Sequence, residues 1–133
     1  MKIFLDDNRN PYDVFRLTIN PIYESTDWVI VKTYEEFVDF IEKNGLPEII
    51  SFDHDLSFDH YYEKNQKGDL DYDSFTEKTG YHSALWLTEY CIIKSLPLPK
   101  WFVHSANPVG SENIKKLLSG FNERPDLNPI PVL

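Results

Sequence analysis

Short apolar segments alternate with amphipathic ones along the chain, and this pattern predicts strands and helices in turn. Strands are expected at residues 2–6, 28–32, 48–53 and 101–103, and helices near residues 12–17 and at 33–44, 79–95 and 111–118. The first strand is apolar without polar alternation, which is typical of a strand buried on both faces. Because strands that alternate with helices pair through crossover connections, the chain is expected to form an α/β fold around a mostly parallel sheet.

Local residue types mark the ends of the two longest predicted helices. Thr33 and Glu36 have the spacing of a capping box at the start of the first, and Gly45 is placed to end it. The second, at 79–95, has four core candidates: Leu85, Leu87, Cys91 and Ile92. Both helices are therefore expected to pack an apolar side against the sheet.

The length of 133 residues predicts a single domain, 1–133, with one insertion. The insertion, at about 56–78, separates the third strand from its helix by more than 20 residues, which is long for such a connection. From Asp53 to Lys78 the chain carries eight acids and three lysines. Two interpretations stay open: a lid or substrate-selecting element over a site, and an acidic loop in solvent.

Acidic residues follow two of the predicted strands. Asp6 and Asp7 come after the first strand, and Asp53 and Asp55 close the third. The carboxyl ends of neighbouring parallel strands meet at one edge, where open α/β sheets bind ligands. Converging carboxylates are what Mg²⁺ or Mn²⁺ requires, so these four acids are candidate ligands of a divalent metal. The alternative for the first pair is a turn held by a salt bridge to Arg9.

Two histidines stand at the same predicted strand ends. His54 lies between the two acids of the third strand, and His104 follows the fourth. Near neutral pH such a pair can serve as general acid and base, although each one alone is more often a structural histidine. In a regular strand His54 points away from the side that carries Asp53 and Asp55, which favours an orienting role for it.

Two predicted helix starts offer backbone N–H groups to an anion. One is the segment 107–111, with Asn107 and Gly110, and the other begins at Thr79. The alternative at both is an ordinary helix cap. Ser105 precedes the first of these starts without a surrounding Ser-His-Asp signature, so it is expected to bond a phosphate and not to act as a nucleophile.

Charge and cysteine content narrow the classes of partner. The formal net charge of −9 argues against broad binding to a nucleic-acid backbone, which needs a basic surface. The single cysteine, Cys91, excludes an internal disulfide and fits a reducing cytoplasm.

Asp6 and Asp7 interrupt the first apolar run, so no signal peptide is expected. No apolar stretch reaches the roughly 18 residues of a membrane span, and no membrane partner is expected.

The acids after the first and third strands and Ser105 after the fourth resemble the site of response-regulator receiver domains. In that family an acidic pair and a phosphoaccepting Asp, here Asp6, Asp7 and Asp53, hold Mg²⁺, and a Ser or Thr contacts the phosphoryl group. The chain departs from the pattern because it lacks the Lys-Pro of a fifth strand. The resemblance implies a flavodoxin-like, receiver-like three-layer fold with four to five mostly parallel strands, the fifth at most a short edge strand from the tail.

The fuller pattern resembles the cyclic-phosphate-processing receiver-like domains of phages and bacteria, over residues 3–118. Four segments carry this resemblance: Phe4–Pro11, Ser51–Leu56, Thr79–Tyr81 and Val103–Gly110. One departure is His82, where an acid is expected.

This resemblance implies a metal-dependent phosphoesterase that processes a cyclic phosphate on a small ligand, a nucleotide or an RNA end, in a bacterial or phage-infected cell. His104 and His54 are then the catalytic candidates, and phosphate oxygens are held by Arg9, Ser105, Asn107, Gly110 and Thr79. The alternative is a non-catalytic receiver-like regulator or ligand-binding domain.

Overall fold

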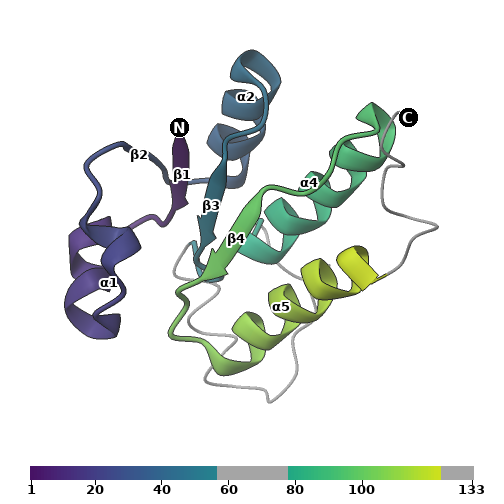
Figure 1. Cartoon of the computed structure of the whole chain (residues 1–133). Helices are drawn as coiled ribbons and strands as arrows, with labels where there is room; N and C mark the ends of the chain where they lie inside the picture. The colour runs from purple at the N-terminus through teal and green to yellow at the C-terminus, as the bar shows by residue number, and fades with distance from the viewer. Residues whose placement is uncertain (57–77, 124–133) are drawn as a thin grey trace.

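A computed structural model of the chain describes residues 1–56 and 78–123, which fold into an α/β domain (Figure 1). The elements in chain order are β1 (Lys2–Leu5), α1 (Pro11–Thr18), the 3₁₀ helix η1 (Pro21–Glu24), β2 (Trp28–Val31), α2 (Tyr34–Asn44), β3 (Ile49–Phe52), α4 (Gly80–Lys94), β4 (Lys100–Val103) and α5 (Pro108–Glu123). The predicted strands and helices are therefore confirmed as elements, and within residues 1–56 and 78–123 only η1 was not foreseen.

The four strands form one parallel sheet in the order β2-β1-β3-β4. Strands β1 and β3 are central in this sheet, and helices lie over both of its faces. Both faces of these strands are therefore buried, which explains why their sequences are apolar without alternation. This arrangement confirms the expected flavodoxin-like, receiver-like α/β fold. All strands run the same way, so their carboxyl ends lie along one edge of the sheet.

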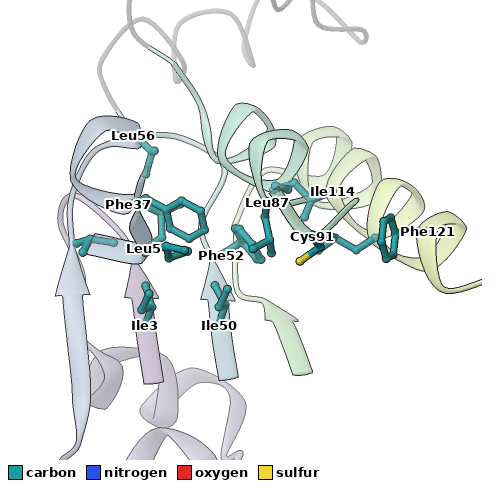
Figure 2. Close-up of a cluster of buried hydrophobic side chains, with 14 residues drawn as sticks. Ile3, Leu5, Phe37, Ile50, Phe52, Leu56, Leu87, Cys91, Ile114 and Phe121 are labelled. Atoms are coloured by element: carbon teal, nitrogen blue, oxygen red, sulfur yellow. The ribbon is translucent and has the colours of Figure 1, made fainter. Parts of the chain in front are cut away.

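Helices α2, α4 and α5 cover one face of the sheet, and α4 and α5 lie side by side (Figure 1). Ile3 and Leu5 of β1 and Ile50 and Phe52 of β3 point into this layer, where they meet Phe37 and Ile41 of α2, Leu87 and Cys91 of α4, and Ile114, Leu118 and Phe121 of α5 (Figure 2). Burial of such side chains stabilises the fold by about 1.5–3 kcal/mol each. This packing lies directly under the strands whose ends carry the candidate site residues.

The other face is covered by α1 and η1. Phe4 of β1, Val14 of α1 and Tyr23 of η1 form its buried cluster. Pro21 fixes the start of η1, and the Asn20 side chain accepts a hydrogen bond from the N–H of Ile22. A four-residue 3₁₀ helix has no amphipathic period to detect in the sequence, which is why the sequence indicated only a loop here.

Two details of the helices differ from the sequence predictions. Helix α5 begins at Pro108 and not at residue 111, because Asn107 caps it and proline suits the first helical position. Leu85 and Ile92, predicted as core residues of α4, are 38% and 42% exposed, whereas Leu87 and Cys91 are buried as predicted. Leu85 and Ile92 line a groove of about 380 Å³ between α4 and α5 instead.

Most of the predicted acidic insertion, and the tail that was considered for an edge strand, lie outside the described residues. A lid over the site therefore stays a prediction. Among residues 1–56 and 78–123, no helix is long and apolar enough to cross a bilayer.

Candidate metal and phosphate site

Three neighbouring strands deliver the candidate residues to one edge of the sheet. The backbone N–H groups of Asp6, Asp53 and His104 donate to the last residues of β2, β1 and β3, at 3.0, 2.9 and 2.9 Å respectively. The sheet ladder thus continues one residue beyond each strand. The polar side chains are fixed by backbone pairing before any of them makes a contact of its own.

The carboxylates of Asp6, Asp7 and Asp53 converge, with one oxygen of each within 4.8 Å of the others. Asp6 and Asp53 are buried, and Asp7 is half-buried. The Oδ1 atom of Asp7 is buried and has no hydrogen-bond partner among the described residues. An acceptor left without a donor costs free energy, and a cation that prefers oxygen ligands would relieve that cost. The donor set therefore fits a divalent metal, as the sequence predicted for these three acids.

Arg9 compensates part of this negative charge. Its Nε donates to Asp6 Oδ2 at 3.1 Å, and its Nη2 lies 3.4 Å from Asp53 Oδ1 and donates to the His104 carbonyl at 3.1 Å. The salt-bridged turn considered from the sequence is thus present. However, three carboxylates and one guanidinium leave two negative charges uncompensated when all three acids are ionised. A divalent cation bound there would supply the missing positive charge.

The acids of the cluster differ in their affinity for protons. Burial, and then the charge of Asp6, raise the pKa of Asp53 to about 7. The same two causes raise the pKa of Asp7. Burial also acts to raise the pKa of Asp6, but hydrogen bonds from His104 and from the N–H groups of Arg9 and Asn8 outweigh it and lower that pKa. Without a cation the cluster keeps Asp6 ionised and strains Asp53, as repulsion between close carboxylates requires.

Asp55 does not join the three converging acids. Its Oδ1 accepts hydrogen bonds from His54 Nδ1 at 2.8 Å and from Asn107 Nδ2 at 3.1 Å. All three residues are buried. They connect the end of β3 to the start of α5, so Asp55 has the supporting position and not the ligand position among the roles predicted for it. Because β3 ends at Phe52, the alternation expected through residue 55 is wrong: the His54 ring bonds Asp55 instead of lying on the opposite side from it.

Two glycines allow this close packing. A Cβ at Gly80 would overlap the carbonyl oxygen of Asp53, and a Cβ at Gly110 would overlap the ring of His54. The N–H of Gly80 donates to the His54 carbonyl at 2.9 Å. The two helix starts therefore lie directly against the β3 end, which only glycine permits.

The helix starts proposed as anion sites are occupied by their own caps. Thr79 is fully buried, and its Oγ1 accepts from the N–H groups of Tyr81 and His82, while its own N–H donates to His82 Nδ1. Asn107 Oδ1 accepts from the N–H of Gly110 at 3.0 Å. Phosphate binding by Thr79, Asn107 or Gly110 would require these contacts to open. Of the predicted phosphate ligands, Arg9 and Ser105 remain partly exposed.

His104 is buried and bonds the acid cluster through Asp6. Its Nε2 contacts Asp6 Oδ2 at 3.1 Å and its Nδ1 contacts Ser51 Oγ at 2.6 Å. The ring stacks on Phe4 with a centroid separation of 4.3 Å. Burial lowers the pKa of His104 and outweighs the opposing hydrogen bond to Asp6. A general acid or base needs a nitrogen that reaches the substrate, and both ring nitrogens are already bonded here.

Two residues of this network were missed by the sequence prediction. Ser51 is a polar residue inside the apolar strand β3, and Tyr23 comes from η1 on the covering layer. Their hydroxyl oxygens are 2.6 Å apart. The signal was the single hydroxyl in an otherwise apolar strand, because a buried hydroxyl needs a partner. Nothing local in the sequence pointed to Tyr23.

Removal of the Asn107 side chain is expected to lower the free energy of unfolding by about 2–4 kcal/mol, since it leaves a buried carboxylate short of a donor and removes a helix cap. Urea unfolding of Asn107→Ala measures the loss. The control is Asn44→Ala, because Asn44 is exposed and bonds only within α2, to the Phe40 carbonyl. Equal losses in the two variants would contradict a stabilising role for the hydrogen bond between Asp55 and Asn107, which connects β3 to α5.

Comparison with known proteins agrees with the fold. No curated protein and no solved structure matches the chain. A family described as the cyclic-phosphate processing receiver domain matches residues 1–120. This range includes all described elements from β1 through β4 and most of α5. The match covers all four strands and each candidate residue. The chain therefore belongs to the family of cyclic-phosphate processing receiver domains.

Proposed function

We propose that the chain is a metal-dependent phosphoesterase that hydrolyses a cyclic phosphate on a nucleotide or an RNA end. The description of its family supports the substrate class. The observation that carries the reaction type is the convergence of Asp6, Asp7 and Asp53 around a buried Asp7 oxygen without a partner among the described residues. Mg²⁺ or Mn²⁺ held by these acids would polarise the phosphoryl oxygen and lower the pKa of a bound water.

The reaction joins a water oxygen to phosphorus and breaks one phosphorus–ribose oxygen bond, and the proton from water ends on the released ribose oxygen. Arg9 is placed to hold the phosphate, because its bonds to described residues use Nε and Nη2 and leave the Nη1 donors for a phosphoryl oxygen. Ser105 Oγ accepts from the N–H of Asn107, so its own proton can be donated to phosphate.

The histidines support carboxylates in this arrangement. His104 contacts Asp6, and His54 contacts Asp55. An acid–base role for His104, predicted from the sequence, requires that one of its two ring contacts opens during the reaction, and the same role for His54 requires access to a fully buried side chain. A positioning role needs no such movement, and the geometry favours it.

Incubation with 2′,3′-cyclic nucleotides tests the proposal. We expect the full chain to convert them to phosphate monoesters with added Mn²⁺ or Mg²⁺, and to stop when the metal is chelated. Phosphorus NMR distinguishes the cyclic ester from each monoester. Failure to turn over any 2′,3′-cyclic nucleotide with either metal, with binding seen only as a shift in melting temperature, would instead favour a ligand-binding domain.

The alternative is a non-catalytic regulator, favoured by the receiver fold and by the position of Asp53 at the end of β3. Receiver domains sense a phosphoryl group through a fifth-strand lysine. Among the described residues the cation beside Asp53 is Arg9, and no lysine bonds this acid. We therefore expect that a beryllium-fluoride mimic of phosphorylation leaves the oligomeric state unchanged, as measured by light scattering. Stoichiometric dimerisation with the mimic would support the regulator.

A further inference from the structure

A buried chain of hydrogen bonds runs from the covering layer to the acid cluster. Tyr23 Oη is 2.6 Å from Ser51 Oγ, Ser51 Oγ is 2.6 Å from His104 Nδ1, and His104 Nε2 is 3.1 Å from Asp6 Oδ2. All four residues are buried. The chain crosses the sheet from η1 through β3 to the residues that follow β4 and β1.

The carboxylate of Asp6 sets the direction of the bonds along this chain. Ionised Asp6 can only accept, so His104 Nε2 carries the hydrogen that is donated to it. In a neutral ring Nδ1 is then an acceptor, and Ser51 must donate to it. Ser51 Oγ accepts in turn from Tyr23, whose hydroxyl stays protonated because burial raises its pKa. The network thus selects the Nε2–H tautomer of His104.

The opposite tautomer would place a lone pair of Nε2 against the Asp6 carboxylate. Asp6 would then lose one of its donors, which are the N–H groups of Asn8 and Arg9, the Arg9 guanidinium and His104. We propose that Tyr23 and Ser51 are positioning residues for the acid cluster: by holding the His104 ring in the orientation that donates to Asp6, they keep Asp6 in place for a divalent cation. This inference rests on the metal site of the proposed function and extends it to two residues that do not touch the metal.

Metal affinity of the full chain for Mn²⁺ alone, measured by calorimetry, tests the proposal. Ser51→Ala is expected to weaken binding about 10–100-fold, the usual loss when a group that orients a metal ligand is removed. Tyr23→Phe removes only the outer hydroxyl and is expected to cost about fivefold. Because both act through one path, the double variant should bind no more weakly than Ser51→Ala alone.

Two matched variants control for the loss of a hydroxyl. Ser83 is as buried as Ser51, but its Oγ has no hydrogen-bond partner in the part of the chain that the structure describes. Tyr12 is 61% exposed. Ser83→Ala and Tyr12→Phe should each change the affinity less than about twofold, within the usual range of neutral substitutions. Affinities for Ser51→Ala and Tyr23→Phe equal to those of these controls would overturn the proposal.

The tautomer itself is read by ¹⁵N NMR of the imidazole in the metal-free protein. We expect His104 to be Nε2–H in the wild type and to stay so in Ser51→Ala, because Asp6 can only accept, but with a shifted Nε2 resonance as the ring loses its second anchor. An Nδ1–H ring in the wild type would overturn the proposal whatever the metal affinities. If the wild type shows the Nε2–H tautomer but binds no Mn²⁺, both the proposed function and the proposed role of Tyr23 and Ser51 in metal binding are wrong. If it binds Mn²⁺ but does not hydrolyse cyclic phosphates, only the proposed function is wrong.

Discussion

Asp53→Asn is expected to abolish Mn²⁺ binding and cyclic-phosphate hydrolysis while the fold persists. The substitution removes one of three converging carboxylates and keeps the shape of the side chain. Asn offers a single neutral oxygen, so both charge and ligand geometry are lost. Metal titration by calorimetry and turnover of a 2′,3′-cyclic nucleotide measure the two losses.

The same variant should be more stable than the wild type in the absence of metal. The pKa of Asp53 has its ordinary value of 3.8 in the unfolded chain and is raised to about 7 in the folded one. The unfolded state therefore loses its proton first as pH rises, and this acid destabilises the fold increasingly between about pH 4 and 7. The shift of roughly three pH units corresponds to about 4 kcal/mol above pH 7. The amide that replaces the carboxyl group does not titrate, so the stability advantage of the variant should grow across this window.

The comparison between variants isolates Asp53 from His104. The lowered pKa of His104 has the opposite sign, because its contribution to stability is present above pH 6.5 and is lost as pH falls. This contribution of His104 is the same in the wild type and in Asp53→Asn, so it largely cancels when their free energies of unfolding are subtracted. Asp39→Asn is the control, since Asp39 is an exposed acid of α2 paired with Lys43. Unchanged Mn²⁺ affinity in Asp53→Asn, or a difference in stability that is flat with pH, would contradict the site.

Gly80→Ala is expected to have the largest effect on stability. A Cβ at this position would overlap the carbonyl oxygen of Asp53 and lie 2.9 Å from its carbonyl carbon, and backbone atoms cannot move aside as a flexible side chain can. Helix α4 or the end of β3 must then shift, at a cost of about 3 kcal/mol or more. The displaced Asp53 should also bind Mn²⁺ more weakly. Thermal unfolding and metal titration report the two effects.

Gly120→Ala is the matched control. It lies within helix α5, and a Cβ there would meet nothing within 4 Å. Alanine has the higher helix propensity, so this variant should gain about 0.5–1 kcal/mol. If the two variants changed stability alike, the close approach of α4 to the Asp53 backbone would be wrong.

The fold could be predicted from sequence because its signals are local. The apolar runs before Asp6, Asp53 and His104, and the caps at Thr33 and Thr79, each act within a few residues of their own position. Parallel strand topology then places the strand ends together without further information. This is why the convergence of three acids was predictable.

The roles of individual side chains were less accessible, because burial and partner choice are set by tertiary packing. Asp55 and Asn107 appeared as candidate ligands, yet they bond each other across 52 residues of sequence. His104 appeared as a free acid or base, while its partner Ser51 lies in another strand and Tyr23 in another layer. No sequence window contains such contacts.

The parallel pairing of β1 with β3 has a kinetic consequence. Asp6 and Asp53 meet only after Leu5 and Phe52 pair, and those residues are far apart along the chain. Closing so long a loop is slow, and the metal ligands do not exist as a set until it has closed. An ion held by these acids would therefore stabilise contacts that form late. Raising its concentration would slow unfolding and leave the folding rate almost unchanged.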